Sequence, residues 1–196
     1  MKIHNFYDKE TATFTYIVID ESSKKCAVID SVLNYDIFSG KTNNASADLV
    51  INYIKENDLE LEWILETHIH ADHLTAASYI KEKLGGKIAI GSSITKVLEF
   101  WVPFFNTSHD TPTDGSQFDK LFDDGEKFFI GSLEVKVIHT PGHTPACVSY
   151  LVGDSIFSGD AIFTPQIGTA RTDFPGGSAK TLYGSIKKIL NLSENT

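Results

Sequence analysis

Apolar residues recur with two periods along this chain, and the alternation predicts a mixed α/β fold. Residues 13–20 and 25–30 are short β-branched and aromatic runs separated by a polar turn, which is typical of an antiparallel hairpin. From Ser46 the apolar positions recur every three or four residues, which predicts a helix with Ser46 as N-cap and an end near Asn57. The polar stretch 34–44 between hairpin and helix is rich in Asn, Gly and Ser and is typical of a loop.

The rest of the chain alternates in the same way. Two successive strand-rich halves, each with helices, favour a two-sheet sandwich with helices outside, built as a single domain over residues 1–196. The remaining expected elements are a strand at 61–66, a helix at 74–84, a strand at 87–90, an aromatic segment at 100–105, a loop at 107–117, a hairpin of 128–130 and 133–139, strands at 147–152 and 155–157, and a helix from Ser178 with Leu182, Ile186, Ile189 and Leu190 on one face.

Composition narrows the class of protein. A chain of 196 residues with 41% hydrophobic and 22% charged residues is an ordinary globular protein. The net charge of -9 argues against a nucleic-acid partner, because phosphate contacts need clustered Lys and Arg. Cys26 and Cys147 do not make a disulfide framework, which favours a reducing compartment. We find no signal-peptide pattern and no long apolar run, so we expect no membrane partner and a cytoplasmic location.

The stretch THIHADH at positions 67–73 is the strongest chemical signal. It follows the apolar run 61–65 in the predicted strand 61–66, and open α/β sheets tend to place ligands at such strand ends. A lone histidine is usually an ordinary core or surface residue, but a dense cluster after a buried strand is seldom so. Imidazole nitrogens and carboxylate oxygens bind Zn²⁺ and non-haem iron. The candidate ligands in this stretch are His68, His70, Asp72 and His73.

Two further turns offer ligands of the same kind. His143 follows Pro141-Gly142, and Asp160 follows Ser158-Gly159. Each turn comes after a predicted strand, and glycine allows a sharp bend that directs the side chain to a shared edge. Either turn alone would be weak evidence, since such turns are common. Together the three segments predict one metal centre.

THIHADH, TPGHT and SGD together resemble the metallo-β-lactamase fold superfamily over nearly the whole chain. The resemblance implies an αββα sandwich of two mixed β-sheets flanked by helices. Members of that superfamily continue to a further strand and histidine, which this sequence lacks before Thr196, so we expect the usual C-terminal end to be missing. In the two-metal form of the superfamily, one ion would take His68, His70 and His143, a second would take Asp72 and His73, and Asp160 would bridge them.

Two longer stretches are similar to the persulfide dioxygenases (sulfur dioxygenases), most closely their bacterial β-lactamase-like branch. They are DGSQFDKLFDDGE at 114–126 and GTARTDFPGGSAKTLYGSI at 168–186. The likeness implies one non-haem Fe(II) per chain, with Zn as an alternative or substitute. A site of two histidines and one carboxylate leaves positions open for O₂ and a sulfur substrate. The implied iron ligands are His68, His143 and Asp160, with His70, Asp72 and His73 as supporting or alternative ligands.

The implied reaction oxidises a thiol persulfide, such as glutathione persulfide, with O₂ to sulfite and thiol in sulfide detoxification. Arg171 is the candidate to stabilise an anionic sulfur or oxygen species, and Asp173 would orient Arg171 or an iron-bound water. A surface ion pair is the alternative for both residues. The competing functions are a zinc-dependent thioester hydrolase of glyoxalase II type and a non-catalytic persulfide-binding module. The expected partner is a small-molecule persulfide, and a homo-oligomer stays open because the aromatic segment 100–105 could pack against another chain.

Overall fold

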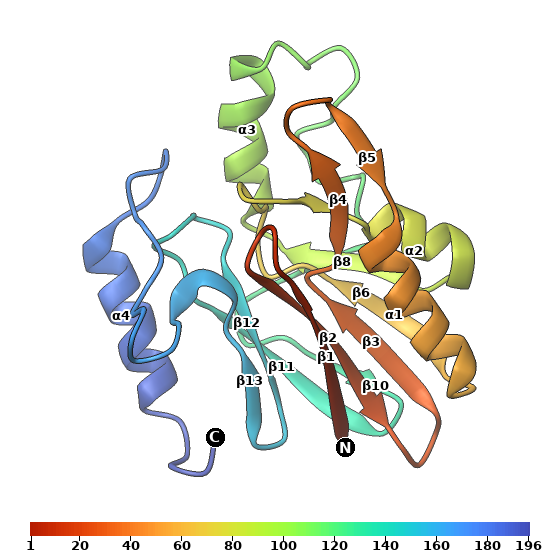
Figure 1. Cartoon of the computed structure of the whole chain (residues 1–196). Helices are drawn as coiled ribbons and strands as arrows, with labels where there is room; N and C mark the ends of the chain where they lie inside the picture. The colour runs from red at the N-terminus through yellow and green to blue at the C-terminus, as the bar shows by residue number, and fades with distance from the viewer. The chain divides into compact units, whose positions relative to one another are not determined.

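The computed structural model describes all residues from Met1 to Thr196 (Figure 1). The chain divides into two compact units, each assembled from segments that are far apart in sequence. Unit 1 comprises Met1–Glu66, His70–Ala89 and Phe129–Leu133, and unit 2 comprises Thr67–Ile69, Ile90–Phe128 and Glu134–Thr196. The expectation of a single domain over residues 1–196 stays a prediction.

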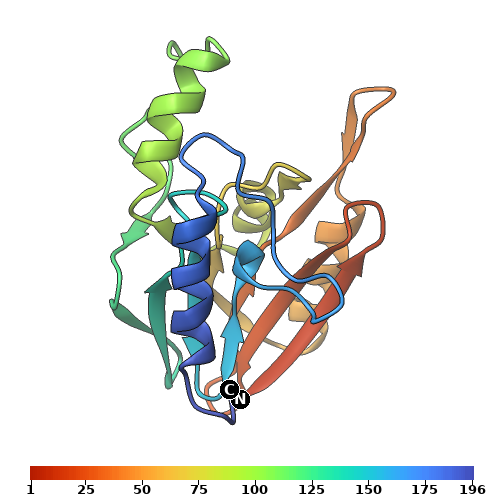
Figure 2. The ribbon, with the colours of Figure 1, turned by 90° about the vertical axis from the view of Figure 1, so that its left-hand side faces the viewer.

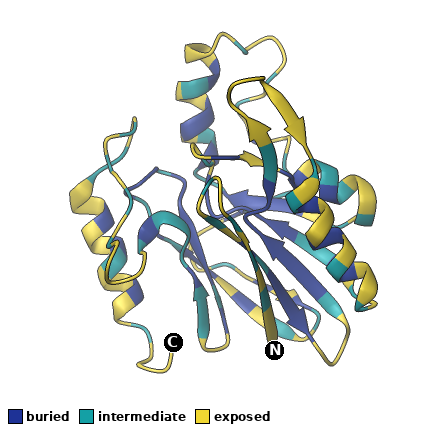
Figure 3. Ribbon diagram, viewed as in Figure 1, coloured by how far each residue is buried: buried dark blue, intermediate teal, exposed yellow.

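A mixed sheet forms the centre of unit 1. The strand order is β1-β2-β3-β6-β8, with antiparallel pairing from β1 to β3 and parallel pairing from β3 to β8. The predicted hairpin of residues 13–30 is therefore confirmed. Four of the five residues of β3 are buried, as expected for a strand covered on both faces (Figure 3). The strands are β1 (Lys2–Asp8), β2 (Thr13–Asp20), β3 (Lys25–Ile29), β6 (Glu60–Leu65) and β8 (Lys87–Gly91).

Residues 34–44 are a second hairpin, so the predicted loop is wrong. Strands β4 (Val32–Asp36) and β5 (Lys41–Asn43) pair antiparallel, and β4 also pairs with the short β7 (Leu74–Thr75). The Asp36 carboxylate accepts hydrogen bonds from the backbone N–H groups of Phe38 at 2.8 Å and Ser39 at 2.9 Å, which tightens the turn. The hairpin needs few apolar residues because β5 is exposed throughout.

Two helices of unit 1 lie side by side, α1 (Ala45–Glu56) and α2 (Ala77–Leu84) (Figure 1). The predicted N-cap of α1 is wrong. The Ser46 hydroxyl donates to Asp8 Oδ2 at 2.9 Å, and Asn44 precedes the helix instead. Helix α2 begins three residues later than predicted because residues 74–75 pair with β4. It ends before Gly85, as predicted.

The second sheet has the order β10-β11-β12-β13, and most of it belongs to unit 2. Buried and exposed residues alternate along β10 and most of β11, which is the pattern of strands with one covered face (Figure 3). The predicted hairpin of residues 128–139 and the following pair of strands are confirmed. The strands are β10 (Lys127–Ile130), β11 (Leu133–His139), β12 (Val148–Val152) and β13 (Ser155–Phe157), and a short β9 (Lys120–Phe122), missed in the sequence, pairs beyond β8.

The last helix, α4 (Ala179–Leu190), packs beside the short 3₁₀ helix η1 (Gly159–Ala161) (Figure 2). The helix begins at Ala179, one residue after the predicted start at Ser178, and Ser178 is its N-cap, because the Ser178 side chain accepts from the backbone N–H of Thr181. The predicted apolar face is correct for Leu182 and Ile189, which are buried against Ala161. The prediction is wrong for Leu190, whose exposed fraction is 68%.

The aromatic segment lies on helix α3 (Ile94–Phe104) of unit 2. Trp101 packs against the cluster of buried residues on the inner face of this helix. Phe100, Phe104 and Phe105 are exposed instead. Of the aromatic residues in this segment, Trp101 is therefore the one that packs against the core.

Candidate metal centre

The first histidine of the cluster belongs to unit 2 and is almost completely buried. Residues 66–73 follow β6 without regular helix, and the Thr67 carbonyl accepts from the backbone N–H of Val148 at 2.9 Å. This bond attaches the segment to β12. A hydrogen bond of 3.0 Å joins the Thr67 hydroxyl to His68 Nδ1. A histidine ring held at Nδ1 in this way can bind a metal through Nε2.

The second histidine lies in the turn between β11 and β12. His143 Nδ1 donates to the main-chain carbonyl of Arg171 at 2.7 Å. Because a carbonyl can only accept, Nδ1 carries the proton, and in the neutral ring Nε2 carries the lone pair. This is the arrangement in which histidines bind metals.

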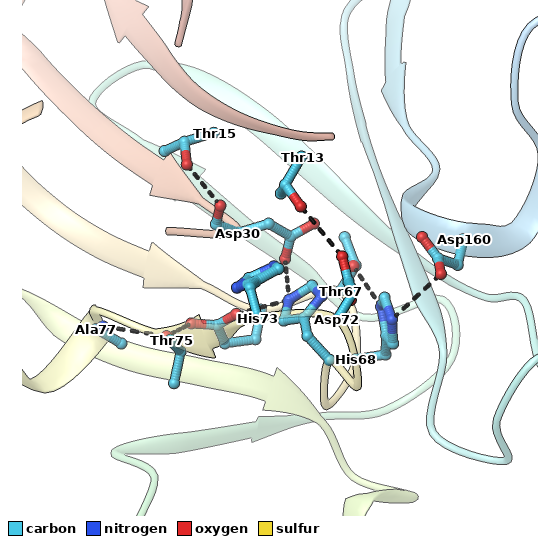
Figure 4. Close-up of polar contacts among 12 residues, drawn as sticks. Thr13, Thr15, Asp30, Thr67, His68, Asp72, His73, Thr75, Ala77 and Asp160 are labelled. Carbon is cyan, nitrogen blue, oxygen red and sulfur yellow. Dashed lines mark hydrogen bonds and ion pairs between the residues drawn. The ribbon is translucent and has the colours of Figure 1, made fainter. Parts of the chain in front are cut away.

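Asp160 completes the group from η1, directly after β13. Its Oδ2 lies 3.4 Å from His143 Nε2. The same oxygen lies 3.7 Å from His68 Nε2 (Figure 4). Gly159 has φ +50 and lies against the Thr67 side chain, where a Cβ would collide. Glycine therefore allows the two ligand-bearing segments of unit 2 to approach closely.

These three residues form a donor set of two imidazoles and one carboxylate. Their ligand atoms all lie within 4.8 Å of one another, and the two imidazole rings are perpendicular with centroids 5.1 Å apart. Metal bonds of about 2.1 Å fit within a triangle of this size. The donor set is the one that divalent iron and zinc accept, so the residues present fit such an ion. The structure thus brings together His68, His143 and Asp160, while their role as ligands stays a prediction.

His70 has different neighbours, all in unit 1. Its Nε2 lies 3.2 Å from Asp30 Oδ1 and 3.1 Å from Glu66 Oε2, and the other Glu66 oxygen accepts from the Thr75 hydroxyl. Burial favours the neutral imidazole, but the two carboxylates outweigh burial and raise the pKa of His70 well above its ordinary value. In this arrangement His70 is held by carboxylates.

Asp72 and His73 also belong to unit 1, and with His70 they form another group of potential ligands. Asp72 accepts from the Thr13 hydroxyl at 3.1 Å (Figure 4). His73 Nδ1 donates to the Leu74 carbonyl at 3.0 Å, and its Nε2 is buried with no hydrogen-bond partner. An orphaned buried nitrogen is costly unless a ligand completes it, so this group also fits a metal.

Arg171 and Asp173 form an ion pair on the segment that contacts His143. The guanidinium donates through Nε and Nη2 to the two carboxylate oxygens at 2.6 Å each. This fork lowers the pKa of Asp173 to about 2. That Asp173 orients Arg171 stays a prediction. Both side chains are about two-thirds exposed, which is also what the alternative of a surface ion pair requires.

Sequence reasoning missed three residues of these groups. Glu66 contacts His70, and the Thr75 hydroxyl donates to Glu66. The Phe174 ring lies perpendicular to His143 with centroids 5.3 Å apart. Glu66 directly precedes THIHADH, so a buried acid beside the cluster was a visible signal. Phe174 had no such signal because its contact joins positions 31 residues apart, 143 and 174.

A family model described as the metallo-beta-lactamase superfamily matches residues 9–194. The chain belongs to the metallo-beta-lactamase superfamily. A Dictyostelium discoideum protein named glyoxylase B2 is 58% identical over 98% of this chain and 67% of its own length. The human mitochondrial protein named persulfide dioxygenase ETHE1 is 32% identical over 97% of this chain and 63% of its own length. The crystal structure of ETHE1 from Myxococcus xanthus superposes with a TM-score of 0.78 and 30% identity, covering 100% of this chain and 73% of that one.

Membership confirms the predicted mixed α/β fold class of the metallo-beta-lactamase superfamily. The superfamily is enzymatic and its fold binds metal ions, for which the structure offers groups of His and Asp side chains. The chain spans about two-thirds of the two relatives named above. None of the four α-helices is long and apolar enough to cross a membrane.

Proposed function

We propose that this chain is a non-haem Fe(II) persulfide dioxygenase, with a thiol persulfide as its small-molecule partner. One persulfide, one O₂ and one water give one thiol and one sulfite, so the outer sulfur is oxidised and O₂ is reduced. The observation that supports this proposal is the donor set of His68, His143 and Asp160. Two neutral imidazoles and a single carboxylate leave coordination positions open for both reactants.

Each ligand residue has a defined task in this proposal. When bound, Fe(II) would supply the redox chemistry with O₂. His68 and His143 would bind through Nε2, because their Nδ1 atoms already bond Thr67 and Arg171. Asp160 would supply a negative charge that offsets part of the ion's charge. The hydrogen bonds at Nδ1 hold both rings in one orientation.

Arg171 is proposed to bind the anionic sulfur or sulfite group. The guanidinium stays charged at all relevant pH values and offers five N–H donors, of which the fork with Asp173 occupies two. The remaining donors are available to an anion because the side chain is 64% exposed. Asp173 would keep the guanidinium in one orientation.

A cytoplasmic location remains part of the proposal.

A zinc-dependent thioester hydrolase of glyoxalase II type is the second candidate. It is favoured by the group of His70, Asp72 and His73, where the buried Nε2 of His73 has no hydrogen-bond partner. Hydrolases of this kind use a metal-activated water as nucleophile. The relative named glyoxylase B2 supports the same candidate. The two candidates differ in their metal and in their need for O₂.

The deciding experiment combines metal analysis with oxygen uptake. Protein reconstituted anaerobically with Fe(II) should hold about one iron per chain and consume O₂ in a 1:1 ratio with glutathione persulfide. The variants His68→Ala and Asp160→Ala should lose the iron and more than ~100-fold of the activity, because each removes a direct ligand. His109→Ala is the matched control, since His109 is 76% exposed on a loop.

Absence of O₂ uptake by folded, iron-loaded protein would exclude the dioxygenase. Thioester cleavage by the zinc-loaded protein, together with that absence, would establish the hydrolase instead. Retention of one iron by both ligand variants would move the metal centre away from the proposed residues.

A further inference from the structure

Residues 171–178 run alongside the turn that carries His143. The segment is attached at both ends, because the Arg171 carbonyl accepts from His143 Nδ1 at 2.7 Å and the Ser178 N–H donates to the Gly142 carbonyl at 2.8 Å. In between, Gly176 lies so close to Pro145 that a Cβ would overlap the proline ring. The segment therefore sits directly against the turn, and all of these residues belong to unit 2.

Phe174 is the side chain of this segment that reaches the His143 ring. Its ring stands at 87° to the imidazole with centroids 5.3 Å apart. The Arg171 guanidinium carbon lies 4.8 Å from the centroid of the same phenyl ring, and Asp173 holds the guanidinium by two hydrogen bonds. The phenyl ring is thus in contact with the imidazole and with a cation that is itself oriented.

Arg171 is the only arginine of the chain, and the other side chains that are permanently cationic at neutral pH are all lysines. Lysine could supply the charge but not this arrangement. A planar guanidinium can stack on a phenyl ring and fork to a carboxylate at the same time, whereas an ammonium group cannot. The residue type thus matches the task of holding Phe174 in place.

We infer that Phe174 is a positioning residue that holds the His143 imidazole ready for metal. The hydrogen bond to Arg171 fixes the protonated nitrogen but still allows the ring to rock about that bond. The perpendicular phenyl ring restricts this motion, so Nε2 stays directed toward Asp160. Ligand rings that must lie within 10–20° of the productive orientation need such support. A perpendicular aromatic contact is also a favoured geometry for the pair.

The test uses the metal-free protein and a metal titration. Phe174→Leu and Phe174→Met keep apolar volume but remove the flat ring, and each should weaken Co²⁺ binding by about 10-fold or more. Phe174→Tyr keeps the ring and should restore the affinity of the original protein. Phe163→Leu is the matched control, since Phe163 lies on the same connection before α4 and has no ring contact with a predicted ligand.

A second readout follows His143 itself. In the metal-free protein, the ¹⁵N and ¹H signals of the His143 ring should broaden or shift in the Leu and Met variants, while those of His68 stay unchanged. A merely structural role for Phe174 would lower the unfolding midpoint without this selective change. Circular dichroism of each variant provides the check on folding.

The inference rests on the proposed metal centre, though not on the reaction catalysed there. It is overturned if the folded Leu or Met variant binds Co²⁺ as tightly as the original protein with unchanged His143 signals. It is also overturned if only the unfolding midpoint changes. If the original protein and His143→Ala bind Co²⁺ equally well, the proposed centre itself fails, which is a separate result.

Discussion

At the scale of single residues, Arg171 serves the site with two different groups. Its main-chain carbonyl accepts from His143, and its guanidinium pairs with Asp173 at the exposed edge of the segment. Substitution of the side chain leaves the carbonyl in place. The two contributions can therefore be separated by experiment.

We expect Arg171→Lys to keep its metal and to lose activity. The lysine ammonium retains the charge but cannot form the fork, so an anionic group would be bound less precisely. Turnover with persulfide should fall about 10-fold. Iron content after reconstitution with excess Fe(II) should stay unchanged, because a less firmly held Phe174 lowers the metal affinity without removing a ligand. Lys136→Arg, on the exposed side of β11, is a matched surface control. Loss of iron from Arg171→Lys even in excess Fe(II) would contradict the role proposed for the guanidinium.

At the scale of elements, helix α4 supports the turn between β11 and β12. The Ser185 hydroxyl donates to the Pro141 carbonyl at 2.7 Å, and Lys188 Nζ donates to the His139 carbonyl at 2.9 Å. Gly142 lies against the backbone of Leu182 and has φ +139. The position of His143 therefore depends on the close contact of this helix with the turn.

Gly142→Ala should destabilise the protein and weaken metal binding together. The added methyl group would overlap the Leu182 backbone, and the positive φ also disfavours alanine, so we expect a loss of about 1–3 kcal/mol in the free energy of unfolding. Urea unfolding and a Co²⁺ titration measure the two effects. Gly184→Ala is the control, because this helical glycine has open space around its Cα and alanine favours helix by about 0.5–1 kcal/mol. Equal stability of the two variants would contradict the close packing of α4.

At the scale of the whole molecule, Asp20 joins segments that are 112 residues apart. It accepts from the side chains of Ser22 and Ser23 in its own turn and from the backbone and hydroxyl of Ser132 in the β10–β11 turn. These bonds favour the ionised carboxylate and lower the pKa of Asp20 far below its ordinary value. Folding stability is thereby linked to pH through this residue.

The stabilisation from Asp20 should disappear in acid. Because its pKa is lower in the folded state than in the unfolded state, the contribution is complete above about pH 5 and decreases as the pH falls below about 4. Asp20→Asn should therefore be less stable than the original protein at pH 7, with a difference that shrinks toward pH 2. Urea unfolding at several pH values measures this. Glu56→Gln, at an exposed position of α1, is the control. A difference that does not depend on pH would exclude the linkage.

The sequence alone determined most of the elements and the candidate ligand set. The hairpin of residues 13–30, the last helix near Ser178 and the strand pair before Asp160 were predicted correctly because apolar period and turn residues are local signals. Where local signals conflict with pairing, the prediction failed. Residues 34–44 were predicted as a loop because an exposed hairpin needs few apolar residues. Residues 74–75 were predicted as helix, but they pair with β4 as a short strand.

Only the tertiary structure decided which neighbours the ligands have. The sequence offered four candidate ligands in THIHADH, and the family resemblance implied that His68 acts with His143 and Asp160. The structure brings these three together in unit 2 and places His70 between Asp30 and Glu66 in unit 1. The contact of Phe174 with His143 is likewise invisible in the sequence. The spacing of residues along the chain shows which side chains could act as ligands. Their partners depend on segments tens of residues apart, whose approach is set by packing and pairing rather than by local period.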